Sequence, residues 1–170
     1  SGVEDTAIGL NISASLTDTD GSEAIWIIVQ GLPQDATMNN GNNKGGGEWL
    51  LLPSQLAGLT VTPPADSDTD FDLTFKFCTR ENANGDITET IRTVHVDVDG
   101  IADAPILELP TVVSGGEDIV LNLPLTAILS DEDGSENLTL TVSGVPTGAT
   151  LNNGLDQGGG IWALLPADLS

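Results

Sequence analysis

Apolar and polar residues alternate along much of the first hundred positions of the chain. In the clearest stretch, 71–77, three phenylalanines and one leucine alternate with Asp72, Thr74 and Lys76. A period of two places the apolar side chains on one face of an extended strand and the polar side chains on the other. The pattern therefore predicts a β-strand at this position rather than a helix.

Six further segments have the same character, and clusters of Gly, Pro, Asn and Asp separate them, as is typical of turns. These segments are 6–12, 24–30, 36–39, 48–52, 59–62 and 87–98. Seven short strands of this kind predict an all-β fold of the antiparallel β-sandwich type. Residues 50–56 could contain one helical turn around Pro53, but the flanking breakers keep it short.

The chain repeats itself at an offset of 113 residues. The hexapeptide Asp-Thr-Asp-Gly-Ser-Glu at 18–23 returns as Asp-Glu-Asp-Gly-Ser-Glu at 131–136, and the second copy reaches Ser170, which corresponds to Ala57. A long internal period indicates tandem structural units. We predict a complete sandwich over 1–103, a linker over 104–113, and the first half of a second, homologous sandwich over 114–170.

Composition narrows the possible partners. The chain has 26 acidic and 4 basic side chains and a net charge of −22, so nucleic acid would repel it. Its apolar runs are far shorter than the roughly 20 residues that a membrane-spanning helix needs, so we expect no direct membrane insertion. With Cys78 as the single cysteine, no intrachain disulfide can stabilise the fold. Because the sequence begins without Met and lacks a signal-peptide pattern, we interpret it as a fragment of a longer polypeptide.

The acidic side chains gather in the predicted turns. If successive strands alternate in direction, the turns after the first, third and fifth strands lie at the same end as the exit of the seventh. That end would collect the acids of 18–23, 66–70 and 97–105 beside the Gly-rich segment 40–47. Carboxylates held so close repel one another unless a cation lies among them. Oxygen ligands in irregular loops suit Ca²⁺ better than Mg²⁺, so we predict a calcium site.

Several motifs resemble the tandem extender repeats of giant bacterial RTX adhesins. They are Glu-Asp-Thr at 4–6, the hexapeptide at 18–23, Gly-Gly-Gly-Glu-Trp at 45–49, Leu-Ala-Gly-Leu-Thr-Val-Thr-Pro-Pro at 56–64, and Val-Asp-Val-Asp-Gly-Ile-Ala-Asp-Ala-Pro at 96–105. The last motif is also similar to the Asp-rich linkers of cadherins, whose domain junctions are stiffened by calcium. The resemblance covers essentially the whole chain. It implies Ig-like or cadherin-like sandwiches joined by a calcium-binding linker, type I secretion, and a place on the outer surface of a Gram-negative cell.

Carried over by position, the resemblance also implies a set of metal ligands. Those expected at the first junction are Asp18, Asp20, Glu23, Asp68, Asp70, Asp99, Asp103 and, from the next unit, Glu117. The acids of the second hexapeptide, Asp131, Asp133 and Glu136, are their counterparts one repeat later. The alternative interpretation is that these acids are solvated surface charges that keep an extracellular protein soluble.

These expectations describe a mechanical protein and not an enzyme. Calcium would stiffen a string of units that projects ligand-binding domains for adhesion or biofilm formation. The alternative is that the chain itself is a ligand-binding module for carbohydrate or peptide, with the Gly- and Asn-rich loop or Trp26 as the contact. Carboxylate pairs can also form a glycosidase site, but here they lie in turns with calcium-loop spacing rather than across a cleft.

The second copy alone would leave an apolar sheet face and unpaired strand edges exposed. We therefore expect another chain or later sequence to supply its remaining strands. Some RTX adhesins contain such split domains, which frame an inserted ligand-binding domain. A third possibility is an assembly device completed by the strands of a neighbouring chain.

Four other residues have side chains that could bind a ligand or react, but a structural role is favoured for each of them. Trp49 recurs at the equivalent position of the second copy as Trp162, which favours packing over a sugar-stacking role. A lone His95 is more often structural or exposed than a zinc ligand. Cys78 has no His partner in its neighbourhood of the sequence, so a nucleophilic role is not expected.

Overall fold

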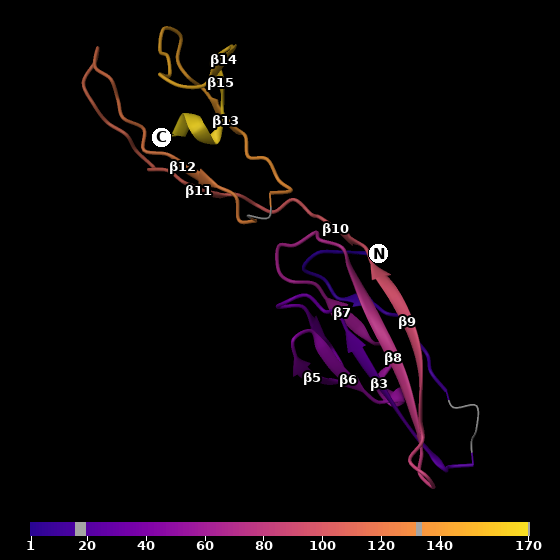
Figure 1. Ribbon diagram of the computed structural model, residues 1–170. Coiled ribbons are helices and arrows are strands. Elements are labelled where there is room, and N and C mark those ends of the chain that lie inside the picture. The colour runs from indigo at the N-terminus through magenta and orange to yellow at the C-terminus, as the bar shows by residue number, and fades with distance from the viewer. Residues whose placement is uncertain (16–19, 132–133, 170) are drawn as a thin grey trace. The chain divides into compact units, whose positions relative to one another are not determined.

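The computed structural model describes residues 1–15, 20–131 and 134–169, and within them the fold is all-β (Figure 1). The chain divides into two compact units, unit 1 over Ser1–Ile101 and unit 2 over Ala102–Ser170. Two short 3-10 helices, η1 (Pro53–Gln55) and η2 (Pro166–Leu169), are the helical elements of the described part. None of the described helices has the length and apolar character required to cross a membrane.

The described residues of unit 1 form two antiparallel sheets and one parallel pair of strands. The larger sheet has the order β5 (Asn42–Gly45), β6 (Glu48–Leu51), β3 (Glu23–Gln30), β8 (Phe71–Glu81), β9 (Ile87–Val96). The smaller sheet has the order β2 (Ile8–Gly9), β7 (Thr60–Thr62), β4 (Thr37–Met38). In addition, β1 (Gly2–Val3) pairs in parallel with β10 (Val98–Asp99).

A hydrophobic core joins both sheets of unit 1. The larger sheet contributes fully buried side chains such as Ile27, Leu73 and Phe75, and the smaller sheet contributes Ile8 and Val61. The alternation that predicted a strand at 71–77 is confirmed, because Leu73 and Phe75 are buried while Asp72 between them is exposed. The arrangement is that of a β-sandwich, with apolar faces turned inward and acidic turns left at its ends.

Strand direction differs from the strict alternation that the sequence suggested. The Asn-rich segment expected to be part of a turn contains a strand of its own, β5, which pairs with β6. This additional strand reverses the direction of every strand that follows it. As a result Glu23 lies opposite Glu81, at the end where β8 turns into β9. Phe71 lies opposite Val96, at the other end, from which the chain leaves the unit (Figure 1).

The turn between β5 and β6 depends on glycine at position 47. Gly47 has φ +76°, and a Cβ there would lie 2.5 Å from the Leu32 carbonyl oxygen. We expect Gly47→Ala to destabilise unit 1 by more than about 1 kcal/mol, because both the backbone conformation and the close approach exclude a side chain. Urea unfolding would measure the change. Gly9→Ala is the matched control, since a Cβ at Gly9 has no atom within 4 Å, and an equal loss in both variants would contradict this account.

Unit 2 repeats part of the architecture of unit 1. Its strands are β11 (Ile106–Glu108), β12 (Thr126–Ile128), β13 (Leu140–Ser143), β14 (Leu155–Gly158) and β15 (Ile161–Leu164). β15 pairs with β13 on one side and β14 on the other, and Val142 lies opposite Trp162 as Val29 lies opposite Trp49. β11 falls within the segment 104–113 that the sequence suggested as a linker, and it pairs with β12 inside unit 2.

Candidate metal centre

Acidic residues gather around the end of unit 1 from which the chain exits, and six of them are considered together. We call them the exit acids: Glu4, Asp66, Asp68, Asp70, Asp97 and Asp99. The parallel pairing of β1 with β10 brings the first residues of the unit to its last, and the Glu4 N–H donates to the Asp99 carbonyl at 3.0 Å. Glu4 is 2% exposed, and its Oε1 accepts a hydrogen bond from the Ile101 N–H at 2.5 Å. A carboxylate from the start of the unit is thus buried against the exit.

Gly100 separates two of these carboxylates. A Cβ built on Gly100 would lie 3.6 Å from Glu4 Oε1 and 3.7 Å from Asp68 Oδ2. Both oxygens therefore approach the same small space beside the backbone of residue 100. Such a space, lined by carboxylate oxygens on a loop, matches the donor chemistry that Ca²⁺ prefers.

A second part of the exit acids surrounds His95. Asp70, His95 and Asp97 have ligand atoms that all lie within 4.8 Å of one another, and all three residues are exposed. Asp70 also fixes the backbone, because its Oδ1 accepts a hydrogen bond from the Val98 N–H at 2.8 Å. A similar hydrogen bond fixes the backbone at Asp66, because the Asp66 N–H donates to Asp5 Oδ1 at 3.1 Å.

His95 titrates in the field of these acids. The hydrogen bond between His95 Nδ1 and Asp72 Oδ1, 2.8 Å long, raises the pKa of the imidazole, and the charges of Asp72, Asp70 and Asp97 raise it further. The raised folded-state pKa means that this interaction stabilises the fold at a pH below about 6.5 and is lost as the pH rises through the folded-state pKa.

His95 is the single histidine of the chain, so its ring protons can be followed by NMR without ambiguity. In a metal-free buffer we expect a pKa above the usual value, and a fall toward that value in Asp72→Asn, because the main hydrogen bond weakens. Asp86→Asn, in the β8–β9 turn at the other end of unit 1, is the control and should leave the titration unchanged. A normal pKa in the unchanged protein would contradict this assignment.

Unit 2 has its own acidic group near residue 103. We call Asp103, Asp131 and Glu136 the unit 2 acids. Glu136 Oε1 accepts a hydrogen bond from the Asp103 N–H at 2.5 Å, and the Ser130 hydroxyl donates to the Ala104 carbonyl at 3.1 Å. Asp131 is 1% exposed. Glu136 Oε2 is buried and accepts no hydrogen bond from any residue that the structure describes.

The sequence-based ligand set is therefore brought together only in part. Asp68, Asp70 and Asp99 share the exit end of unit 1, whereas Asp103, Asp131 and Glu136 belong to unit 2. The expectation that Asp20 and Glu23 share the exit end is wrong, because the additional strand β5 places their turn at the opposite end of unit 1. Asp18 and Asp133 lie outside the described residues.

The sequence predicts Glu117 at the first junction, but its counterpart in unit 1 argues against this position. Glu117 corresponds to Glu4, which lies at the exit of its own unit. Glu117 itself is exposed in a turn. By the same template it belongs to the exit end of unit 2, not to that of unit 1.

Glu4 is the residue that sequence reasoning missed in unit 1. The signal was present in the repeat, because Glu-Asp recurs at 4–5 and 117–118. Its meaning depended on the two-residue strand β1, whose parallel partner is almost a hundred residues away. A strand of two residues is too short to show side-chain alternation in the sequence.

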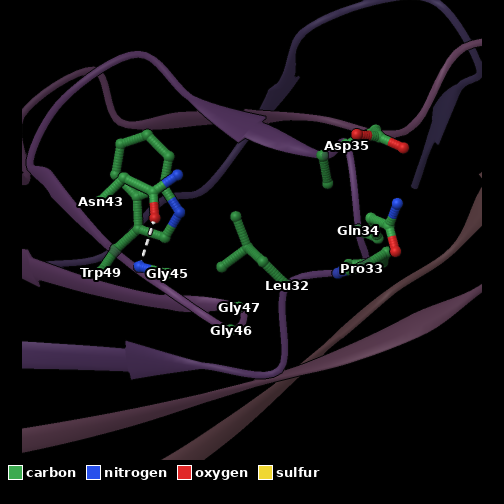
Figure 2. A pocket seen from close by; sticks show the side chains of 10 residues that line it. Leu32, Pro33, Gln34, Asp35, Asn43, Gly45, Gly46, Gly47 and Trp49 are labelled. Carbon is green, nitrogen blue, oxygen red and sulfur yellow. Dashed lines mark hydrogen bonds between the residues drawn. The ribbon is translucent and has the colours of Figure 1, made fainter.

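A pocket of about 460 Å³ on unit 1 is the second candidate site. Figure 2 shows Trp49 and Asn43 on one side of it, Leu32 between, and Gln34 and Asp35 on the other side. Asn43 Oδ1 accepts a hydrogen bond from the Gly45 N–H at 2.8 Å, which fixes the Gly-rich turn that forms part of the wall. The lining combines amide, carboxylate and backbone groups with a small apolar surface.

Cys78 offers no reactive thiol. It is buried, and burial raises the pKa of its thiol, with the Glu89 carboxylate adding to the increase. A thiol in this state forms little of the thiolate that acts as nucleophile.

Comparison of the chain with protein-family models, curated proteins and solved structures found no match.

Proposed function

We propose that the chain is a calcium-stabilised structural extender from a secreted, cell-surface adhesin of the RTX type. In this role Ig-like units adjoin further units of the same polypeptide and project ligand-binding domains for adhesion or biofilm formation. The tandem repeat, the acidic composition and the resemblance of the motifs support the proposal. No catalytic step is part of it.

The buried Glu136 Oε2 is the observation that carries the proposal. Unit 2 contains ten acidic side chains and no Lys, Arg or His, so no side chain of the unit supplies a positive charge. A buried carboxylate is normally paired with a cation or coordinates a metal. Glu136, with the neighbouring Asp103 and the buried Asp131 of the same unit, offers hard oxygen donors of the kind that Ca²⁺ selects.

The exit acids of unit 1 support a second calcium position. Glu4 and Asp68 direct carboxylate oxygens at the space beside Gly100, and Asp70 already orders the backbone at Val98. Bound calcium would supply positive charge that offsets the mutual repulsion of these acids. Two hydrogen bonds of the chain would add to this effect. Glu4 accepts one from the Ile101 N–H, and Glu136, in the second hexapeptide, accepts one from the Asp103 N–H. Both flanks of residues 99–103 would thereby lose freedom, which stiffens the chain at this point.

Extracellular calcium modules bind with dissociation constants of about 10⁻⁴ to 10⁻³ M. That range suits a protein that stays flexible in the low calcium of a cell interior and stiffens after export.

Calorimetric titration with Ca²⁺ tests this function directly. We expect saturable binding in the unchanged chain and at least about tenfold weaker binding at one site in Glu136→Gln, because the carboxylate charge is lost. Gln retains the oxygen that accepts the Asp103 N–H, so the fold should survive. Glu108→Gln, an exposed position in the same unit, is the matched control and should bind like the unchanged chain. Absence of calcium binding in the unchanged chain would refute the proposal.

The pocket beside Trp49 favours a second function, a module that binds carbohydrate or peptide. Its polar lining differs between the repeats, since Gln34, Asp35 and Asn43 are replaced by Thr147, Gly148 and Asp156. A polar lining that differs while the Gly-Gly-Gly and Trp positions recur is what a recognition site on a common scaffold would show. Chemical-shift changes confined to these residues on addition of oligosaccharides or peptides would support this function.

A further inference from the structure

Four polar residues face one another across the ends of β8 and β9. Asp72 lies opposite His95 in the ladder between these strands. Asp70 directly precedes β8 and Asp97 directly follows β9, so each lies two positions closer to the exit of unit 1. Because alternate residues of a strand point to the same face, Asp70 and Asp72 share a face of the larger sheet with His95 and Asp97. The pairing of two strands thus surrounds one imidazole with three carboxylates.

The ring of His95 is held at one nitrogen and leaves the other available. Nδ1 lies 2.8 Å from Asp72 Oδ1. An ionised carboxylate only accepts hydrogen bonds, so the proton of the neutral ring lies on Nδ1 and the lone pair lies on Nε2. Nε2 is 3.6 Å from Asp70 Oδ2, which is too far for a hydrogen bond. Two ligand atoms of a tetrahedral zinc ion are about 3.4 Å apart, so this separation fits two ligands of one metal ion.

Backbone contacts position the two carboxylates beside Nε2. Asp70 Oδ1 accepts a hydrogen bond from the Val98 N–H at 2.8 Å, which leaves Oδ2 on the side of the imidazole. The Asp97 carbonyl accepts a hydrogen bond from the Gly2 N–H at 3.0 Å, which ties the backbone of Asp97 to β1. Ligand atoms of Asp70, His95 and Asp97 already lie within 4.8 Å of one another. Small side-chain movements therefore bring all three to a common ion.

The donor atoms distinguish this group from the calcium position beside Gly100. Ca²⁺ and Mg²⁺ take oxygen ligands, whereas an imidazole nitrogen suits Zn²⁺ and other first-row transition metals. A histidine that binds a metal usually donates its other ring N–H to a carboxylate, and Asp72 accepts that hydrogen bond here. The side chains of His95 and Asp70 are 62% and 45% exposed. An ion can therefore enter from solvent, and water can fill a fourth coordination position.

We propose that Asp70, His95 and Asp97 bind a divalent transition metal ion such as Zn²⁺, with Asp72 as a positioning residue. The ion binds His95 Nε2 and one carboxylate oxygen of each ligating acid. It links the end of β9, at the edge of the larger sheet, to the start of β8. Its positive charge offsets the repulsion between Asp70 and Asp97, which lie opposite each other on neighbouring strands. The site does not depend on calcium binding or on the proposed function.

Calorimetric titration of the whole 170-residue chain with Zn²⁺ tests the site. The titration is carried out at about pH 8, which favours the neutral imidazole, and in about 10 mM Ca²⁺, which fills sites made of oxygen ligands alone. We expect saturable binding at one site that both His95→Gln and Asp97→Asn weaken at least about tenfold, because each removes a ligand. Asp86→Asn removes the same charge at the other end of unit 1 and should weaken binding by less than about twofold.

Nitrogen NMR of the imidazole tests the role of Asp72. His95 is the single histidine of the chain, so its two ring nitrogens can be assigned directly. In the unchanged chain Zn²⁺ should shift the Nε2 resonance while Nδ1 keeps its proton. Asp72→Ala frees the ring, so we expect at least about tenfold weaker binding and metal-induced shifts at both nitrogens. Asp72 is exposed, and a metal-free Tm close to that of the unchanged chain would show that the variant folds.

Four results would overturn the proposal. The first is no saturable Zn²⁺ binding in excess Ca²⁺, since the acids would then prefer the harder ion. The second is equal Zn²⁺ binding by the unchanged chain and His95→Gln, and the third is equal weakening by Asp97→Asn and Asp86→Asn. The fourth is attachment of Zn²⁺ to Nδ1 in the unchanged chain. Failure of the chain to bind calcium would leave the zinc site standing, because calcium binding is measured separately.

Discussion

Addition of Ca²⁺ to a metal-free sample is expected to raise the free energy of unfolding substantially. An ion that binds only the folded state stabilises it as the ion concentration exceeds the dissociation constant. At about 10 mM Ca²⁺ and a dissociation constant of roughly 10⁻⁴ to 10⁻³ M, the gain is about 1.4 to 2.7 kcal/mol for each site. In a unit of roughly 100 residues this corresponds to a rise in Tm of about 4 to 8 °C for each kcal/mol.

The variants at the exit of unit 1 locate the effect. Glu4→Gln combined with Asp68→Asn removes two negative charges beside Gly100, while Gln retains an oxygen for the Ile101 N–H. We expect this double variant to lose most of the calcium-dependent rise in the Tm of unit 1. Without calcium it should be as stable as the unchanged chain or more stable, because less repulsion remains.

Asp20→Asn combined with Asp86→Asn is the matched control, since the structure places Asp20 and Asp86 in the two turns at the opposite end of unit 1. This control variant should keep the full calcium-dependent rise in the Tm of unit 1. A calcium response equal in both double variants would show that the exit acids are not the site. If calcium raised the Tm of none of these proteins, the acids would be surface charges only. The pocket beside Trp49 would then be favoured as the functional site.

Phe75→Ala is expected to destabilise unit 1 by about 3 to 5 kcal/mol, the usual cost of removing a buried aromatic ring. Phe75 is completely buried in the middle of β8, opposite Val29, and its ring stacks near that of Phe77 with centroids 6.2 Å apart. The loss combines the transfer of the ring from the core with the cavity left between the sheets. Urea unfolding followed by tryptophan fluorescence measures it through Trp26 and Trp49 of the same unit.

Ile87→Ala at the start of β9 provides the comparison. Ile87 is exposed, so its replacement should change stability by less than about 0.5 kcal/mol. If Phe75→Ala lowered the free energy of unfolding no more than Ile87→Ala does, the result would contradict the packing of the two sheets around β8.

The sequence determined the strand character of unit 1 because side-chain alternation follows directly from backbone geometry. Phe71–Glu81 begins with alternating apolar and polar residues, and Glu23–Gln30 contains a run of apolar residues, so both strands can be recognised without knowing their partners. The repeat also predicted a second unit homologous to the first, and β14 pairs with β15 as β5 pairs with β6. The location of the acids in turns also followed from composition, because charged residues are excluded from the core.

Which turns meet was decided by the tertiary structure. β5 consists of Asn42–Gly45, and all four residues are exposed, so no apolar pattern marks it as a strand. This one strand, which the sequence did not predict, reverses the direction of every later strand. Asp20 and Glu23 therefore lie at the end of unit 1 opposite to Asp68 and Asp99. Glu4 reached the exit through a two-residue parallel pairing across the whole length of the unit, which no local pattern encodes. Local sequence fixes how each strand presents its side chains, but the ends that come together depend on long-range pairing between strands, and only the folded chain establishes that pairing.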